Sequence, residues 1–373
     1  MKKRTVRLIH LASYLGLICL VCGLAGPATA QEELRSRFFR DVVAGGGLHF
    51  QHWSGADNLE VRQFSVPLTF VWSLNKRLSL DMVAGSGFAT LDQDASTSLK
   101  GLTDTRIRAS CILGDELLLL TAGVSAPTGK TELDDQEREV SNFLAQDGLG
   151  FRTPSFGQGL DVNLGAATAH RIGETVFGVG AGYLIKGAFT PQHGGAEYQP
   201  GNELSLTAGV DREIMAGDGQ LTLDLIYTLY DQDEQEGTKA FQAGDKILLQ
   251  ALGMFRAGLD WRVYLSGRTR GRSTSYTVDS EVEFANGEQF EAGLSAATIG
   301  AGPVQVRALG DFKLYADNEF NRGEAAIWGA GPGLRLKMSS ASSIDLNFKY
   351  LRGSIDAADV SGVDISGGIW IKL

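Results

Sequence analysis

The segment at residues 123–131, GVSAPTGKT, has the glycine, lysine and threonine of a phosphate-binding loop. That loop has four residues between its two glycines, because their backbone N–H groups must form a cradle around the phosphate. Here five residues separate Gly123 from Gly129, and Pro127 removes one N–H donor. The acidic run ELDDQERE follows directly. A nucleotide site is therefore not predicted.

Four histidines beyond residue 30 could carry acid–base chemistry. His49 and His52 have an odd spacing, which places them on opposite faces of a strand. His170 lies beside a predicted short turn. His193 lies in a long polar segment, where the glycines after it offer no acid or nucleophile as a neighbour. The sequence also lacks the G-x-S-x-G nucleophile elbow. We therefore expect the protein not to be an enzyme.

The acidic segments could bind Ca²⁺, but they lack the D-x-D-x-D-G spacing of a calcium loop. No metal and no cofactor are expected.

Residues 1–30 have the order of a secretory signal peptide: basic residues, an apolar stretch from Leu8 to Ala25, then Ala28-Thr29-Ala30. The alternative is an N-terminal membrane anchor. Cleavage would start the mature chain at Gln31, so we expect one domain over residues 31–373. Removing the four basic residues of the signal leaves 30 basic and 44 acidic residues, a net charge of −14. So acidic a chain is not expected to bind nucleic acid.

Cys19 and Cys22 belong to the predicted signal, so Cys111 remains alone and cannot form an intramolecular disulfide.

Strict alternation of apolar and polar residues is the strongest structural signal. In residues 219–230, GQLTLDLIYTLY, Leu221, Leu223 and Leu225 alternate with polar side chains. Residues 61–72, 259–266 and 342–351 repeat the pattern. These segments are predicted to be strands with one apolar face.

Short and long connections alternate along the chain. Short turns are expected at 75–76, 114–115, 172–173, 216–219, 257–258, 301–302 and 339–342, and long loops at 54–60, 92–101, 127–157, 190–202, 231–244, 274–287, 317–325 and 354–362. This is the pattern of an outer-membrane barrel, with short periplasmic turns and long extracellular loops. The sequence therefore predicts an all-β, closed antiparallel transmembrane β-barrel of about 16 strands, with about 12–18 as the range, in the outer membrane of a Gram-negative cell.

The last residues resemble the closing-strand signal read by the barrel insertion machinery, through Ser366, Gly368, Ile371 and Leu373. Leu373 stands where that signal has an aromatic residue. The expected partners are this machinery and outer-membrane lipid. Trp53, Trp72, Tyr183 and Tyr227 are candidates for the aromatic girdles at the membrane interfaces.

Four consecutive segments carry a family resemblance: GLTDTRIRASCIL, LLLLTAGVSAPTGKT, FGQGLDVNLGAATAHRIG and VFGVGAGYLIKG. Over roughly residues 101–215 the chain resembles the outer-membrane proteins named after the meta-pathway of phenol degradation. Ala126 and Thr103 depart from that pattern, where leucine and glycine are usual. The resemblance implies a transporter-like barrel, related in architecture to the long-chain fatty-acid channels.

Fatty-acid channels carry an N-terminal hatch, whereas only about seven residues separate Gln31 from the first predicted strand. The long segment 127–157 is instead the candidate to fold inward and narrow the pore. An outward-projecting loop is the alternative, and the sequence does not favour either one. The charged residues of this segment that could form a constriction are Lys130, Asp134, Asp135 and Glu137.

Charged residues opposite the apolar faces are predicted to line the lumen, since ionisable groups are costly at the lipid face. They are Asp104, Arg106, Arg108, Lys246, Arg256, Arg262, Arg268, Arg270, Arg307, Asp311 and Lys313. Because most of them are basic, the lining would favour anionic solutes. Alternatively, the arginines pair with lumen acids and stiffen the wall.

Two functions remain open. The first is passive passage of small solutes, whether aromatic, otherwise hydrophobic or anionic. The second is a non-transporting surface barrel, acting as a scaffold or as an outer-membrane enzyme.

Overall fold

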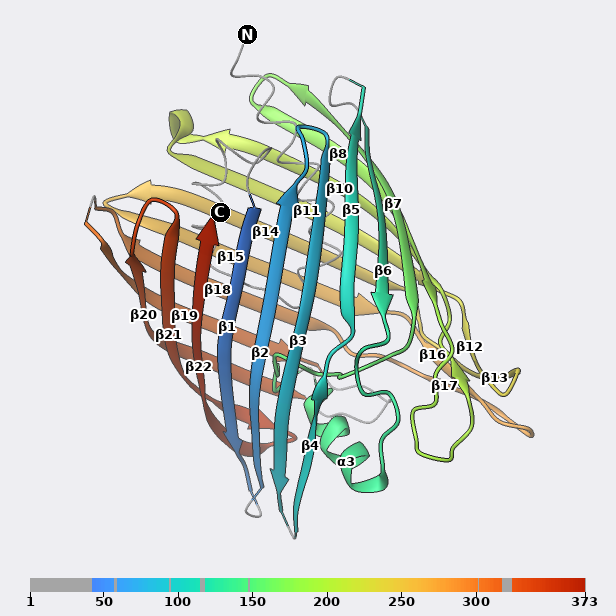
Figure 1. Cartoon of the computed structure of the whole chain (residues 1–373). Helices are drawn as coiled ribbons and strands as arrows, with labels where there is room; N and C mark the ends of the chain where they lie inside the picture. Colours follow the sequence, from blue (N-terminus) through green and yellow to red (C-terminus); the bar gives the residue numbers. More distant parts are fainter. Residues whose placement is uncertain are drawn as a thin grey trace.

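The computed structural model describes residues 42–56, 59–93, 95–114, 118–146, 148–300, 302–316 and 324–372. They form a closed antiparallel β-barrel (Figure 1). β1 (Val42–Ser54) pairs with β22 (Ala358–Lys372) from Val43 to Ser54, and this pairing closes the cylinder. The predicted signal peptide and Leu373 lie outside the described residues.

Sixteen strand positions make the wall of the described barrel, as predicted. One position is divided between β4 (Ser96–Leu102) and β5 (Thr105–Leu113), because both pair with β3 (Leu78–Asp92). The other wall strands are β2 (Glu60–Ser73), β6 (Leu118–Ala126), β7 (Asp161–Ile172), β8 (Thr175–Lys186), β10 (Glu203–Ile214), β11 (Gly219–Tyr230), β14 (Lys246–Ala257), β15 (Leu259–Arg270), β18 (Gln289–Thr298), β19 (Val304–Tyr315), β20 (Ala325–Lys337) and β21 (Ser342–Ile355).

Alternation along each strand separates an apolar outside from a mostly polar inside. On β11, Leu223 and Leu225 are each 45% exposed on the outer face, whereas Thr222 and Thr228 point inward and are buried. The exposed large apolar side chains recur on the same face around the wall. A surface this apolar is stable against hydrocarbon and not against water. The predicted face assignment is therefore confirmed.

The two rims differ as expected. The connections 74–77, 173–174, 215–218, 258 and 338–341 are short and lie at the rim where β1 begins and β22 ends, which is the periplasmic rim by the rule for outer-membrane barrels. We call the opposite end the outer rim. The helices of the described residues are α3 (Asp135–Leu144), at the outer rim, and η1 (Met215–Gly217), a periplasmic turn. None of them is long and apolar enough to cross a membrane.

Two predicted long loops are wrong. The segments 92–101 and 354–362 are mostly strand, because β3 continues to Asp92, β4 begins at Ser96, and only residues 356–357 separate β21 from β22. Asp356 and Ala357 have φ of 52° and 62°, the conformation of a tight two-residue hairpin turn. These strands continue beyond the apolar band, so their outer halves carry the polar residues of a loop while the ladder continues.

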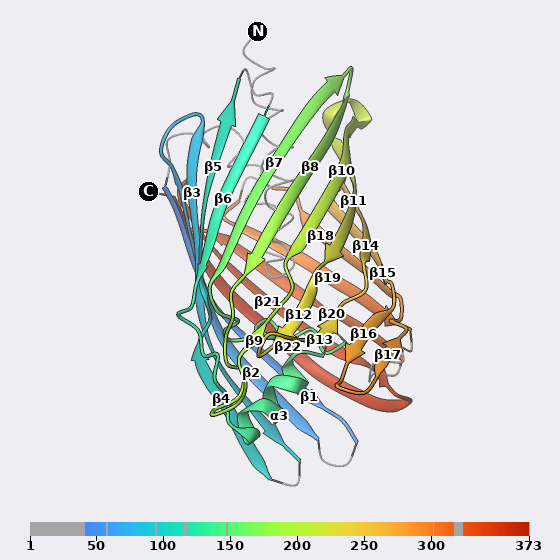
Figure 2. The ribbon, with the colours of Figure 1, turned by 90° about the vertical axis from the view of Figure 1, so that its right-hand side faces the viewer.

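Three other predicted loops form part of a second sheet at the outer rim. Its strands are β9 (Tyr198–Gln199), β12 (Gln232–Gln235), β13 (Thr238–Gln242), β16 (Ser273–Tyr276) and β17 (Glu281–Phe284). Figure 2 shows this sheet beside α3. The Tyr198 hydroxyl donates to Asp233, and burial together with this carboxylate raises the pKa of Tyr198.

Of the predicted girdle residues, Trp72 and Tyr183 are 43% and 38% exposed on the outer face. Trp53 is only 3% exposed and points into the barrel, so its assignment to a girdle was wrong. Its indole N–H donates to the carbonyl of Leu149, 3.1 Å away.

Replacement of Leu223 by Arg is expected to destabilise the barrel by about 2–4 kcal/mol, because it places a charge against lipid near the middle of β11. The neighbouring lumen substitution Asp224→Asn serves as the control and should change stability little. Unfolding in detergent or lipid measures both, and equal small effects would contradict the face assignment.

Candidate functional site

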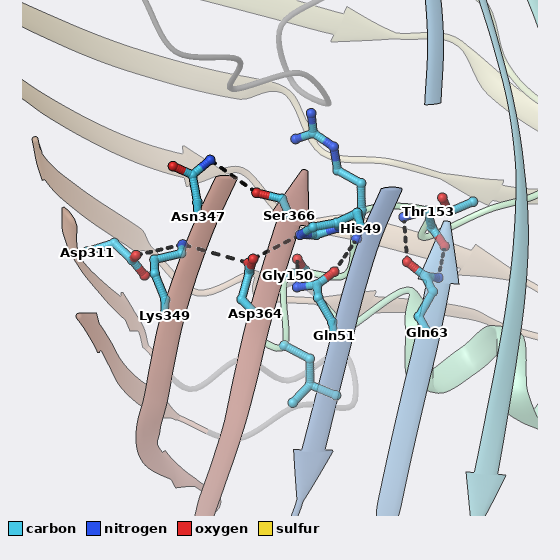
Figure 3. Close-up of polar contacts among 12 residues, drawn as sticks. His49, Gln51, Gln63, Gly150, Thr153, Asp311, Asn347, Lys349, Asp364 and Ser366 are labelled. Atoms are coloured by element: carbon cyan, nitrogen blue, oxygen red, sulfur yellow. Dashed lines mark hydrogen bonds and ion pairs between the residues drawn. The ribbon is translucent and has the colours of Figure 1, made fainter. Parts of the chain in front are cut away.

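The segment between β6 and β7, residues 127–160, lies inside the outer half of the barrel, and we call it the inner loop. Gln63 of β2 donates to the Thr153 carbonyl (2.7 Å) and accepts from the Thr153 N–H (2.9 Å). Gln51 of β1 does the same with Gly150 and Arg152, at 3.0 and 2.7 Å (Figure 3). Both glutamine side chains point into the lumen and are at most 3% exposed. Two adjacent strands thus hold the loop by its backbone.

An apolar cluster fixes the same loop against the wall. From the loop it contains Val140, Leu144, Leu149, Phe151 and Phe156, and from the wall Trp53, Val61, Ala89, Leu91, Leu99, Ile327, Leu351 and Val360. The wall members belong to β1–β4 and β20–β22 and all face inward. The loop therefore fills one side of the lumen, so the inward alternative is the one adopted.

Asp104 clamps the neck of the inner loop. Its carboxylate accepts the N–H of Gly129 at 2.9 Å and that of Gln158 at 2.7 Å, so it holds both legs of the loop. Its own N–H donates to the Phe156 carbonyl. A Cβ on Gly129 would lie 2.1 Å from that carbonyl oxygen, so only glycine fits there.

The three motifs GLTDT, PTGKT and FGQG meet at this clamp. Thr128 donates to the Thr103 carbonyl (3.0 Å) and accepts the Thr105 N–H (2.9 Å). Pro127 lies just after the end of β6, where no ladder donor is needed. The residues that suggest a phosphate loop therefore anchor a loop within the barrel.

The four predicted constriction residues lie at the start of the inner loop and bind within it or to its neighbour. Lys130 pairs with Glu137. Asp134 caps α3 and forms a capping box with Glu137. Asp135 accepts from Arg138 and from Gln192.

The loop residue that the sequence did not single out is Arg152. It lies among buried neighbours, and this burial lowers its pKa, while the charge of Asp364 partly offsets the effect. No sequence signal distinguishes Arg152, because the position that it takes depends on Gln51 and Gln63.

A chain of ion pairs runs across the lumen side of β1, β22, β21 and β19, beside the loop (Figure 3). His49 Nε2 lies 3.0 Å from Asp364 Oδ1, and Lys349 Nζ lies 3.7 Å from Asp364 Oδ2 and 2.8 Å from Asp311. Asn347 donates to Ser366 beside this chain. The predicted lumen residue Asp311 is therefore neutralised by Lys349.

Other predicted lumen charges are paired in the same way. Arg307 and Arg335 both bind Asp345, and all three are at most 4% exposed. Other pairs join Arg108 to Asp81 at 2.7 Å and Arg262 to Asp260 at 3.5 Å. These contacts fit the alternative in which the arginines pair with lumen acids and stiffen the wall.

The remaining predicted lumen residues also occupy inward positions, on β5, β14, β15 and β19. They are Arg106, Lys246, Arg256, Arg268, Arg270 and Lys313. Lys246 and Arg270 both contact the ring of Tyr230, with Lys246 Nζ 5.8 Å and Arg270 Cζ 4.9 Å from its centroid.

A cavity of about 250 Å³ lies against the wall formed by β5–β8 and β10. Its charged lining residues are Arg106, Arg108, Asp161, Lys186 and Glu203. Small and apolar residues, among them Leu119, Leu184, Gly165 and Gly180, form much of the rest. The cavity therefore offers both apolar surface and charge.

The histidines are dispersed. His49 and His52 face opposite sides, as predicted, since His49 points into the lumen and His52 lies 3.8 Å from Glu60. The expectation that His193 has no acidic neighbour was wrong, because Glu132 lies 3.2 Å away in an exposed contact. Among the described residues, no group of three or more His, Cys, Asp or Glu could hold a metal ion.

No protein-family model and no curated protein sequence matches the chain. Among solved structures, the CymD monoaromatic hydrocarbon channel is similar over 94% of this chain and 94% of its own, with a TM-score of 0.46 and 12% identity. An outer membrane channel from Pseudomonas putida F1 is similar over 90% of this chain and 96% of its own, with a TM-score of 0.41 and 11% identity. Pseudomonas putida OprB is similar over 89% of this chain and 93% of its own, with a TM-score of 0.49 and 10% identity.

The closed antiparallel sheet of 16 strand positions is a β-barrel of the outer-membrane type, so the fold implied by the family resemblance is confirmed. The closed sheet and its apolar outer face indicate the outer membrane.

Replacement of Asp104 by Ala is expected to loosen the neck of the inner loop, since two charge-assisted hydrogen bonds worth roughly 1.5–3 kcal/mol each are lost. Trypsin should then cleave after Arg152 faster than in the unmodified protein, as followed by mass spectrometry. Asp311→Ala, a lumen substitution that does not contact the loop, is the control. Unchanged cleavage of the Asp104→Ala variant would argue against the clamp.

The double substitution Gln51→Ala with Gln63→Ala removes four hydrogen bonds to the loop backbone and should release the loop from the wall, at about 1 kcal/mol per bond. We expect the single-channel conductance to rise while the barrel stays folded. The matched control is Gln250→Ala, whose side chain bonds only Tyr264 of the wall (2.9 Å) among the contacts described. An equal change in both variants would show that the loop does not limit the current.

Proposed function

We propose that the protein is a passive channel for small solutes across the outer membrane of a Gram-negative cell. The observation that carries this proposal is the asymmetric filling of the lumen. The inner loop occupies the side formed by β1–β4 and β20–β22, and a cavity remains against β5–β8 and β10. A scaffold needs only a filled, rigid interior, whereas a channel needs a narrowed space with a polar lining.

The size and lining of the cavity support single-ring aromatic solutes, including aromatic acids. An apolar cavity of about 150 Å³ can hold benzene, and the cavity here has about 250 Å³. Leu119 and Leu184 supply apolar contacts, and Arg106 offers positive charge to a carboxylate. Lys186 is already paired with Glu203. Fatty chains and large sugars fit this volume less well.

The route to the membrane belongs to the same proposal. Residues 1–30 direct export and are cleaved before Gln31, and the closing strand is read by the barrel insertion machinery. Ser366 and Gly368 face inward on β22 and Ile371 faces outward.

Planar-bilayer recording of the purified protein tests the channel directly, and we expect steady currents. Liposome swelling should then be faster with benzyl alcohol and benzoate than with glucose or a fatty acid. A folded barrel that carries no current and no solute would favour the non-transporting scaffold. Recordings of the protein after heating above its unfolding temperature provide the control for detergent leaks.

A further inference from the structure

Two positive charges lie side by side in the lumen near the outer rim. Lys246 at the start of β14 and Arg270 at the end of β15 are directly opposite each other in the ladder. Both point inward and are half-buried. Like charges placed opposite each other across two strands are destabilising, so this pair requires a compensating partner.

The only partner described for either side chain is Tyr230, at the end of β11. Arg270 donates to its hydroxyl at 3.4 Å, and both cations lie within 6 Å of its ring. Cation–π contacts at exposed sites are worth about 0.5–1 kcal/mol, and the ring carries no net charge. Among the described residues, no carboxylate lies within 4.0 Å of either cation.

Several other basic groups in the lumen are neutralised by acids. Arg108 has Asp81, Arg307 has Asp345, and Lys349 has Asp311.

Two acids close to this group in the wall are already engaged. Glu203, directly opposite Tyr230 in the ladder, pairs with Lys186. Asp245, next to Lys246, accepts the hydroxyl of Tyr227, 2.6 Å away. The wall of β11, β14 and β15 therefore keeps two positive charges available to an external anion.

We propose that Lys246 and Arg270 bind the carboxylate of a small organic anion in the outer half of the lumen. The guanidinium of Arg270 can donate two parallel hydrogen bonds to a carboxylate, and the ammonium of Lys246 adds a point charge. Tyr230 holds both cations beside each other. Leu248, the next inward residue of β14, is 9% exposed and offers apolar surface to the body of the solute.

This site rests on the proposed channel and gives it a chemical preference. An anion bound near the outer rim is concentrated on the outer side of the cavity formed by β5–β8 and β10. The preference is for monocarboxylates with a small apolar body, such as benzoate, over neutral molecules of the same shape.

The test measures binding and transport separately. Titration calorimetry of the purified barrel with sodium benzoate should show saturable binding, with benzyl alcohol as the neutral comparison. The double variant Lys246→Gln with Arg270→Gln should weaken benzoate binding about tenfold, corresponding to loss of about 1.4 kcal/mol. Lys246→Arg keeps the charge and should bind nearly as the unmodified protein does.

Lys239→Gln is the matched control. Lys239 also lies over a tyrosine ring, 5.5 Å from the centroid of Tyr276, but it belongs to the outer sheet. In liposome swelling, the double variant should lose benzoate flux and keep benzyl alcohol flux, while Lys239→Gln should keep both. The shift of the folded band on unheated gels confirms that each variant is assembled.

Unchanged benzoate binding in the double variant would overturn the site. So would an equal loss of binding in Lys239→Gln, because it would reduce the effect to net charge. A barrel that carries no solute but loses benzoate binding in the double variant would support the site and refute the channel. A barrel that conducts solutes but binds benzoate equally well in the double variant would support the channel and refute the site.

Discussion

Closure of the sheet between β1 and β22 is the constraint on which the rest of the structure depends. In hydrocarbon an unpaired backbone N–H or C=O costs several kcal/mol, so a sheet can cross a membrane only if it has no free edge. Twelve residue pairs join the two strands, from Val43 with Lys372 to Ser54 with Ser361. Once the cylinder is closed, alternation determines the fate of every side chain: one face meets lipid and the other meets the lumen.

The one wall position that is interrupted is also where the inner loop is attached. β4 and β5 are separated at Thr103 and Asp104, and Thr103 still donates to Gly85 of β3 while Asp104 turns to the loop. β6 is short, so β4 pairs with β3 on one edge and has no strand on the other. That side of β4 packs against α3 instead. The edge that a longer β6 would cover is thus shielded by a helix and the loop neck, a recognised way of protecting a strand edge.

Much of the fold could be predicted from sequence because the period of two is a local signal. The lipid face, the strand number and the short turns follow from it. The signal is weaker outside the bilayer, where both faces of a strand are polar. Hence β4 and the outer half of β22 looked like loops, although Leu99 and Val360 are buried there against the inner-loop cluster.

The placement of the inner loop could not be predicted, because it depends on partners about 90–100 residues away in sequence, a separation over which local patterns carry no information. Gln51 and Gln63 are ordinary polar residues on the lumen face, and no neighbouring residue in the sequence indicates that Gly150 and Thr153 are their partners. Trp53 looked like a girdle residue because it is an aromatic residue near a strand end. Alternation along β1 places Trp53 on the lumen face, where its N–H donates to the Leu149 carbonyl.

The lumen charges separate into two kinds, and this separation connects the fold to function. Around β19–β22 the charges form buried pairs such as Arg335 with Asp345, and there the desolvation cost is offset only because each ion has a fixed partner. Those groups stiffen the wall that carries the loop. Across the lumen, Lys246 and Arg270 are half-buried and have an aromatic ring in place of an acid. A positive charge without a fixed counter-ion stays available to a passing anion, whereas a paired one does not. The inner loop and the unpaired cations therefore lie on opposite walls, and a solute moving between them meets a rigid surface on one side and an exchangeable charge on the other.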